Sequence, residues 1–234
     1  MQLFYNPNIL EDTELVVFDK EESKHIIKVL RKSVGDVLEI TNGNGWLFKA
    51  SITLANIKNC QASIIEKEKK SKRDFHIHLA VAPTKLNDRY EWFLEKSTEL
   101  GINEITPIVC DHSERKVIKH ERYSKIIQSA MKQSLQCYLP ILNQLTPINE
   151  FINTSHNGQK FIAHCDNGKK LSLKNELRAK QDVTILIGPE GDFSVKEIEM
   201  ALNSNFIPVT LGETRLRTET AAVVACHSVV FKNE

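Results

Sequence analysis

The sequence lacks the features that would place the protein in a membrane or outside the cell. No window approaches about 18 uncharged apolar residues, and no basic segment near the start precedes a long apolar run. We therefore expect no membrane partner and a cytoplasmic location. Excess charge of one sign is lacking too: the formal net charge is +1, so any contact with a polyanion must come from local clusters.

Motifs built on cysteine are missing. The five cysteines are far apart and form no C-x-x-C pair, which argues against a disulfide framework or a zinc ribbon. We expect reduced, mostly buried thiols. His76 and His78 could share one face of a strand, but no third ligand is apparent, so we expect no metal. Phosphate-binding fingerprints are also absent: no G-x-G-x-x-G follows a strand, and no glycine-rich turn ends in Lys-Ser/Thr.

The first 70 or so residues favour a small β-barrel. Short strand-like runs are separated by polar turns, and Asn42-Gly43-Asn44-Gly45 between two of them is a strong hairpin signal. One helix is expected from about Glu21 to Leu30. The charged stretch 66–73 has no apolar periodicity and is the candidate linker. The strand-like runs cover residues 3–5, 15–18, 37–41, 46–54 and 62–66.

From residue 73 the pattern changes, so we expect two domains, 1–72 and 73–234. Strand-like runs now alternate with helical patterns, which predicts an α/β domain with a mostly parallel sheet covered on both faces. The expected strands are 76–82, 104–109, 160–164, 183–187 and 207–211, and the clearest helices are 88–100, 123–135, 195–203 and 218–231.

Two glycine-containing turns are the candidate binding site. The apolar run Val183–Ile187 leads into Gly188-Pro189-Glu190-Gly191 and then a helix start, with Ser194 and Glu197 forming a capping box. In open α/β sheets ligands bind beyond the carboxyl ends of strands. Glycines there allow unusual φ/ψ and close approach of a ligand to the backbone. An ordinary strand-to-helix turn is the alternative, but the stretch 211–222 has the same form, and two such turns could close on one ligand.

Local basic clusters are the candidate nucleic-acid contacts. Lys67–Arg73 is the first, and a solvated surface or linker explains it more simply than RNA does. The second contains Arg115, Lys116 and Arg122. Arg89 and Glu91 lie on one predicted helix, where surface or interface ion pairs are the first interpretation and RNA contact the second.

The motifs together resemble the RsmE family of SPOUT-class methyltransferases. The motifs are G-P-E-G-D-F-S at 188–194, L-G-x-x-x-L-R-T-E-T-A at 211–221, K-x-x-D-R-x-E with E-L-G-I over 85–102, S-E-R at 113–115 and H-x-x-x-V-L-R at 25–31. The resemblance covers essentially the whole chain. It implies a SPOUT-type, trefoil-knotted domain after a small PUA-like, RNA-binding β-barrel domain.

The resemblance also implies the activity. Members methylate N3 of a uridine in 16S ribosomal RNA, bind S-adenosylmethionine in the knot and form homodimers. The expected partner is therefore 16S rRNA or the small ribosomal subunit, and Arg31, Arg115, Lys116 and Arg122 are expected to contact it. Donor contacts are expected at Gly188, Pro189, Glu190, Gly191, Leu211, Gly212, Leu216, Thr220 and Ala221.

The reaction suggests the catalytic residues. A sulfonium methyl is already activated, so the protein must align the reactants and manage the N3 proton. Arg217 suits stabilisation of charge on the ring oxygens. Glu219 could orient Arg217 or accept the proton, although a carboxylate in a first helical turn is also favourable by itself.

One stretch departs from the family. Lys132 and Gln136 stand where many relatives have E-Q-S-x-R, which questions any RNA or dimer role of those positions. The alternatives are a SPOUT enzyme acting on another RNA atom or on tRNA, and a non-catalytic RNA-binding assembly factor. A nucleotide-using metabolic enzyme is a poor alternative, because the sequence has no phosphate-binding motif and such an enzyme would not need the small β domain.

Overall fold

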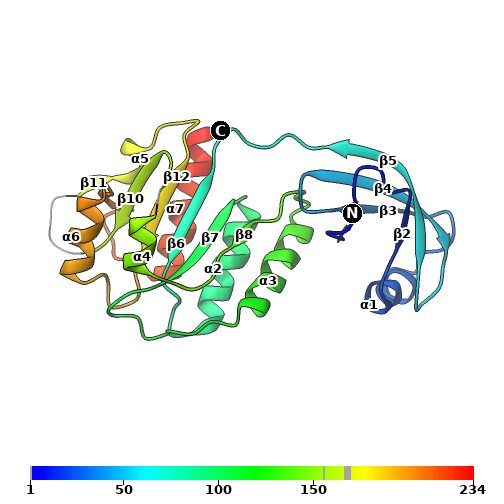
Figure 1. The fold of residues 1–234 in the computed structure, drawn as a ribbon, viewed down its shortest axis with the longest axis horizontal. Coiled ribbons are helices and arrows are strands. Elements are labelled where there is room, and N and C mark those ends of the chain that lie inside the picture. The colour runs from blue at the N-terminus through cyan, green and yellow to red at the C-terminus, as the bar shows by residue number, and fades with distance from the viewer. Residues whose placement is uncertain (1, 155, 166–169) are drawn as a thin grey trace. The chain divides into compact units, whose positions relative to one another are not determined.

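The computed structural model describes residues 2–154, 156–165 and 170–234, and the chain forms two compact units (Figure 1). The first comprises Met1–Lys72 and Met131–Leu139, and the second comprises Arg73–Ala130 and Pro140–Glu234. The expected boundary near residue 72 therefore needs one amendment: a short segment from the middle of the sequence packs with the first unit. Among the residues described, no helix is long and apolar enough to cross a membrane.

The first unit is a curled five-stranded sheet with strand order β1-β3-β4-β5-β2. In the described part of the chain no pairing joins β1 to β2, so the sheet does not close completely into the expected barrel. Phe4, Ile40 and Phe48 are among the buried residues of its core. The elements are β1 (Leu3–Tyr5), β2 (Leu15–Val17), α1 (Lys20–Lys24), η1 (His25–Val29), β3 (Val37–Thr41), β4 (Trp46–Leu54) and β5 (Gln61–Lys69).

The Asn42–Gly45 turn joins β3 to β4, which confirms the hairpin. Gly45 has φ +88°, and a Cβ placed on it would lie 2.3 Å from the Tyr138 ring. The returning segment docks here, since the Gly45 amide donates to the Cys137 carbonyl at 2.8 Å. Glycine is therefore required at this position both by the backbone and by close packing.

Two expectations for the first unit are wrong in detail. The linker begins later than residue 66, because β5 continues to Lys69 along β4 and Glu66 accepts a hydrogen bond from Lys49 at 2.8 Å. The end of β5 is charged, so it shows no apolar periodicity although it pairs with β4. The single helix expected from Glu21 to Leu30 is a short α-helix, α1, followed by the π-helical segment η1.

The second unit contains an eight-stranded sheet in which every pairing is parallel, with the order β11-β13-β10-β12-β6-β7-β8 and β9 beside β7. This confirms the expected parallel α/β sheet. The strands are β6 (Ile77–Val81), β7 (Glu104–Val109), β8 (Ile141–Leu142), β9 (Thr146–Pro147), β10 (Gln159–Ala163), β11 (Leu171–Ser172), β12 (Val183–Ile187) and β13 (Ile207–Thr210). The helices are α2 (Asn87–Glu99), α3 (His120–Gln133), α4 (Ile148–Asn153), α5 (Leu173–Glu176), α6 (Val195–Asn203) and α7 (Thr218–Asn233).

Helices cover both faces of this sheet (Figure 1). Ala80 and Ala82 belong to a core that contains Phe151 of α4 and Ile198 of α6. Neighbouring positions on β6 point the opposite way, toward the face where α7 and α2 pack together. Both faces of the central strands are buried, so these strands read as continuous apolar runs.

Candidate functional site

A cavity of about 310 Å³ lies at the carboxyl edge of the parallel sheet. Its wall is built from the ends of β10 and β12, the turn after β12, the segment between β13 and α7, and the first turn of α2. The lining residues are Arg89, Ala163, Cys165, Ile187, Gly188, Pro189, Glu190, Asp192, Arg215, Leu216, Arg217, Thr218, Glu219 and Ala221. The carboxyl edge is where ligands bind in open α/β sheets.

The two turns singled out in the sequence form this wall together. Thr218 is buried, with 6% of its surface exposed, and its hydroxyl donates to the Gly188 carbonyl at 3.0 Å. A second, longer contact of 3.5 Å joins a guanidinium nitrogen of Arg215 to the Glu190 carbonyl. The structure thus connects segments that are 25 to 30 residues apart in sequence.

Polar side chains fix the turn after β12 to neighbouring loops. A Glu190 carboxylate oxygen accepts from the Lys85 amide at 2.9 Å, and an Asp192 oxygen accepts from the Cys165 amide at 2.7 Å. The His112 ring lies 3.1 Å from the Gly191 carbonyl oxygen. The turn is therefore held on several sides, as a preformed binding site requires.

The reason for the two glycines of this turn differs from the expected one. Neither adopts the left-handed backbone; Asp192 does, with φ +64°. A Cβ on Gly188 would lie 3.1 Å from the Phe193 ring, and one on Gly191 would lie 3.0 Å from the Cβ of His112. Close packing inside the protein, not unusual φ/ψ, therefore favours glycine at these positions.

The helix that follows begins as predicted. Ser194 and Glu197 form both hydrogen bonds of a capping box at the start of α6. Asp111 adds a link to the β7 loop, since its amide donates to Glu197 at 2.8 Å and its carboxylate accepts from the Ser194 hydroxyl at 2.6 Å.

The charged groups of the cavity have an arrangement that sequence analysis missed. Glu219 is buried in the first turn of α7, but its ion-pair partner is Arg89, with Nε 3.8 Å from Oε1, and not Arg217. Arg217 is exposed at the N-cap of α7. Arg89 was expected to form a surface or interface ion pair, and its position in the first turn of α2, after β6, places that pair at the same sheet edge as the two turns.

Comparison with known proteins agrees with this architecture. A family model described as an RNA methyltransferase domain matches residues 69–230, and one described as an RNA methyltransferase PUA domain matches residues 18–65. The "Ribosomal RNA small subunit methyltransferase E" of Buchnera aphidicola is 33% identical over 92% of this chain and 87% of its own length. The chain belongs to the small-subunit rRNA methyltransferase E (RsmE) family.

Solved structures of RsmE-like proteins have the same fold. A "probable rRNA-methyltransferase" from Porphyromonas gingivalis has a TM-score of 0.92 and 42% identity, with 100% of this chain and 98% of that one covered. The ribosomal RNA small subunit methyltransferase E of Neisseria gonorrhoeae, bound to S-adenosyl methionine, has a TM-score of 0.84 and 26% identity, with 97% and 96% covered. The first unit is accordingly the PUA-type domain, and the chain is an RNA methyltransferase by family.

Several predicted donor-site residues do not line the cavity. Gly191, Leu211, Gly212 and Thr220 lie beside it in the sequence, while Gly188, Pro189, Glu190, Leu216 and Ala221 form part of its wall. Gly212 has φ +154°, and a Cβ there would meet nothing within 4 Å. The Thr210 hydroxyl donates to the Gly212 carbonyl at 2.7 Å.

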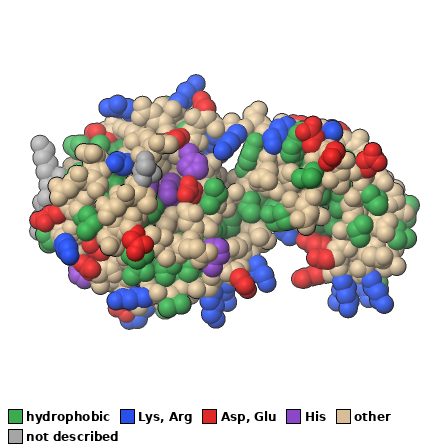
Figure 2. Space-filling model, in the orientation of Figure 1, with side chains coloured by type: hydrophobic (Ala, Val, Ile, Leu, Met, Phe, Trp, Pro, Cys, Tyr) green, Lys and Arg blue, Asp and Glu red, His purple; other side chains and the backbone are tan. Residues whose placement is uncertain are grey.

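The four basic side chains predicted to contact RNA differ in whether they are exposed or already bound to other groups of the protein. Arg31 and Lys116 are exposed. Arg115 holds the loop before α2, with donors 3.0 Å from the Thr84 carbonyl and 2.8 Å from the Lys85 carbonyl. Arg122 is bidentate to Glu91, with the longer contact at 2.8 Å. Figure 2 shows basic side chains interspersed with acidic ones over the face drawn.

The two altered family positions both have partners. Lys132 is 3.3 Å from a carboxylate oxygen of Glu22 in α1, and Gln136 donates to the Ser134 hydroxyl at 2.9 Å. Lys132 therefore joins the returning segment to the rest of the first unit.

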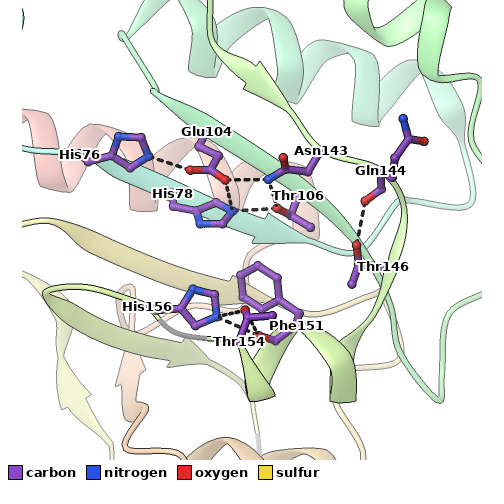
Figure 3. Close-up of polar contacts among 10 residues, drawn as sticks. All are labelled: His76, His78, Glu104, Thr106, Asn143, Gln144, Thr146, Phe151, Thr154 and His156. Atoms are coloured by element: carbon purple, nitrogen blue, oxygen red, sulfur yellow. Dashed lines mark hydrogen bonds and ion pairs between the residues drawn. The ribbon is translucent and has the colours of Figure 1, made fainter.

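His76 directly precedes β6 and His78 lies within it, and both side chains turn toward Glu104 (Figure 3). His76 donates to this carboxylate at 2.9 Å, which lowers the pKa of Glu104 to about 2. Burial lowers the pKa of His78 to about 4, and its ring lies 2.7 Å from the Thr106 hydroxyl. Among the described residues no group of three or more His, Cys, Asp or Glu is arranged to hold a metal ion.

Four cysteines are buried, and burial raises the pKa of each thiol, that of Cys226 to about 12. This suits the structural role expected for them. Cys165 is the exception, because it is exposed and lines the cavity.

Proposed function

We propose that this protein uses S-adenosylmethionine to methylate N3 of a uridine in 16S ribosomal RNA of the small subunit. Membership of the RsmE family supports the reaction class. The observation that carries the site assignment is that both strand-ending turns line one cavity. The ribosomal substrate in turn supports a cytoplasmic location.

The lining of the cavity fits the donor. S-adenosylmethionine combines an adenosine, a sulfonium cation and an amino acid, so its site needs apolar surface and charges of both signs. Ile187 and Leu216 supply apolar surface, and the cavity also presents arginines and carboxylates. Its volume of about 310 Å³ is at the lower end of the range for ligand sites.

The donor supplies an electrophilic methyl on sulfur, ready for in-line displacement. The protein's share is then to hold the base edge in line and to stabilise the ring as N3 loses its proton. Arg217 and Glu219, the predicted catalytic pair, both line the cavity. Gly188, Pro189, Glu190, Leu216 and Ala221 form the donor wall in this proposal, with Gly191, Leu211, Gly212 and Thr220 shaping the turns behind it.

We divide the RNA work between the units. The first unit, with Arg31 exposed, binds structured RNA, and Lys116 adds a phosphate contact from the second. Arg115 and Arg122 support these surfaces mainly by holding loops and α2. By family resemblance the protein acts as a trefoil-knotted homodimer, and light scattering after size exclusion tests this: a monomeric mass at micromolar concentration would contradict it.

The test of the function is a deletion strain. A methyl at N3 blocks base pairing, so reverse transcription of small-subunit RNA should stop at one uridine in the parent, read through in the deletion strain and stop again after complementation. A stop that persists in the deletion strain would refute the assignment. A modification lost from another RNA atom or from tRNA would indicate a different SPOUT activity, and donor binding without any lost modification would indicate an assembly factor.

A further inference from the structure

Arg89 is the cation of the cavity that pairs with a buried carboxylate. Its side chain is 34% exposed, and its Nε lies 3.8 Å from a carboxylate oxygen of Glu219, whose side chain is 10% exposed. The two residues come from different helices, α2 and α7, which pack against each other. A carboxylate buried this deeply requires a compensating charge.

The guanidinium of Arg89 still has free donors. Among the residues that the structure describes, neither Nη atom of Arg89 has a hydrogen-bond partner, so its outer edge is available to a ligand. In Arg215, by contrast, one guanidinium nitrogen already donates a hydrogen bond to the Glu190 carbonyl. Arg217 is exposed, and no described residue holds its side chain in place.

Pre-organisation distinguishes these arginines. A donor fixed before the reaction costs no reorganisation when charge develops, and this makes such groups the strongest electrostatic catalysts. An exposed arginine must first lose side-chain entropy. Arg89, held on one edge and open on the other, meets the requirement better than Arg217.

We infer that Arg89 is the catalytic cation that contacts a carbonyl oxygen of the target uracil, and that Glu219 is the positioning residue that holds it. The inference rests on the proposed function and revises which residues of the cavity perform it. As the N3–H bond breaks, the proton passes to solvent water and the charge spreads to the ring oxygens beside N3. The N3–methyl bond then forms as the sulfur–methyl bond breaks, and the sulfur keeps the electron pair.

A purely structural ion pair is the competing explanation, and pH separates the two. Loss of a stabilising cation lowers the rate most at a pH at which free uridine keeps its N3 proton, because the enzyme must then favour deprotonation. Raising the pH deprotonates uridine without help, so the defect of an Arg89 variant should shrink as pH rises. A variant that is merely misfolded would lose the same fraction of activity at every pH.

The experiment compares Arg89→Ala, Arg89→Lys and the double variant Arg89→Gln with Glu219→Gln. The double variant removes both charges and so avoids leaving a buried carboxylate unpaired. Lys96→Gln is the matched control, because Lys96 is also an ion-paired cation on α2 but lies outside the cavity. Readouts are kcat with unmethylated small subunits from pH 6.5 to 9, urea unfolding, and calorimetric Kd for S-adenosylhomocysteine.

We expect Arg89→Ala and the double variant to lose about 10²–10³ in kcat at pH 7, the effect of removing one pre-organised donor, with donor Kd nearly unchanged. The loss should narrow with pH, Arg89→Lys should keep part of the activity, and millimolar methylguanidinium should rescue Arg89→Ala. A kcat within about twofold of wild type, or a loss that neither narrows with pH nor is rescued, would overturn the inference. Inactive wild-type protein in the same assay would instead count against the proposed function.

Discussion

Replacement of Thr218 by valine tests whether the two turns form one site. The Thr218 hydroxyl donates to the Gly188 carbonyl at 3.0 Å in a buried position. Valine has nearly the same shape but cannot donate, so it leaves that carbonyl buried without this partner. Such a loss costs about 1–3 kcal/mol in the free energy of unfolding. If the turns separate, donor binding must bring them together again, so Kd should rise by up to about 5- to 150-fold.

Urea unfolding and calorimetry with S-adenosylhomocysteine measure the two effects. Thr218→Ser keeps the hydroxyl and should stay near wild type in both. Thr98→Val is a matched control, because the Thr98 hydroxyl donates to the Leu94 carbonyl inside α2, away from the cavity. It should lower stability without changing donor affinity. Unchanged stability together with unchanged donor affinity in Thr218→Val would refute the reasoning.

Three further outcomes follow from the structure. Gly188→Val should weaken donor binding more than Glu190→Gln and should also lower the melting temperature, because its Cβ would press on Phe193; normal calorimetric binding by Gly188→Val would remove the turn from the site. Arg31→Ala should weaken RNA binding and reduce the salt slope by about 1 without changing donor affinity; an unchanged slope in filter binding would exclude a phosphate contact. The depressed pKa of His78 (about 4) means that the unfolded chain takes up a proton before the folded one. The free energy of unfolding should therefore be undiminished by His78 above about pH 6.5 and should decrease as pH falls toward 4. In His78→Asn the urea midpoint should change less over that pH range, and an equally steep fall would contradict the prediction.

Long, regular elements could be predicted from sequence, whereas short or charged ones could not. The strands 104–109 and 183–187 and the helix 195–203 occur where expected, because two-sided burial and a capping box leave clear signals. The elements β8, β9, β11, α4 and α5 are too short to show a period. The end of β5 was missed because its stabilising partner is the neighbouring strand, which composition does not reveal.

The site could be located from sequence, but the pairing inside it could not. The two glycine turns lead to the cavity because both follow buried strands at one sheet edge. Which arginine meets Glu219 depends on the packing of α2 against α7, a contact between segments 130 residues apart in the chain. One signal was available: Arg89 follows the end of β6, so the rule that located the turns also applied to it.

The central claim is that both strand-ending turns bind one donor molecule, and hydrogen–deuterium exchange tests it most directly. Amide exchange is measured in peptides covering 187–194 and 211–222, with and without saturating S-adenosylhomocysteine. The account predicts slower exchange in both segments at the same ligand concentration. Protection of only one segment, or of neither, would contradict it.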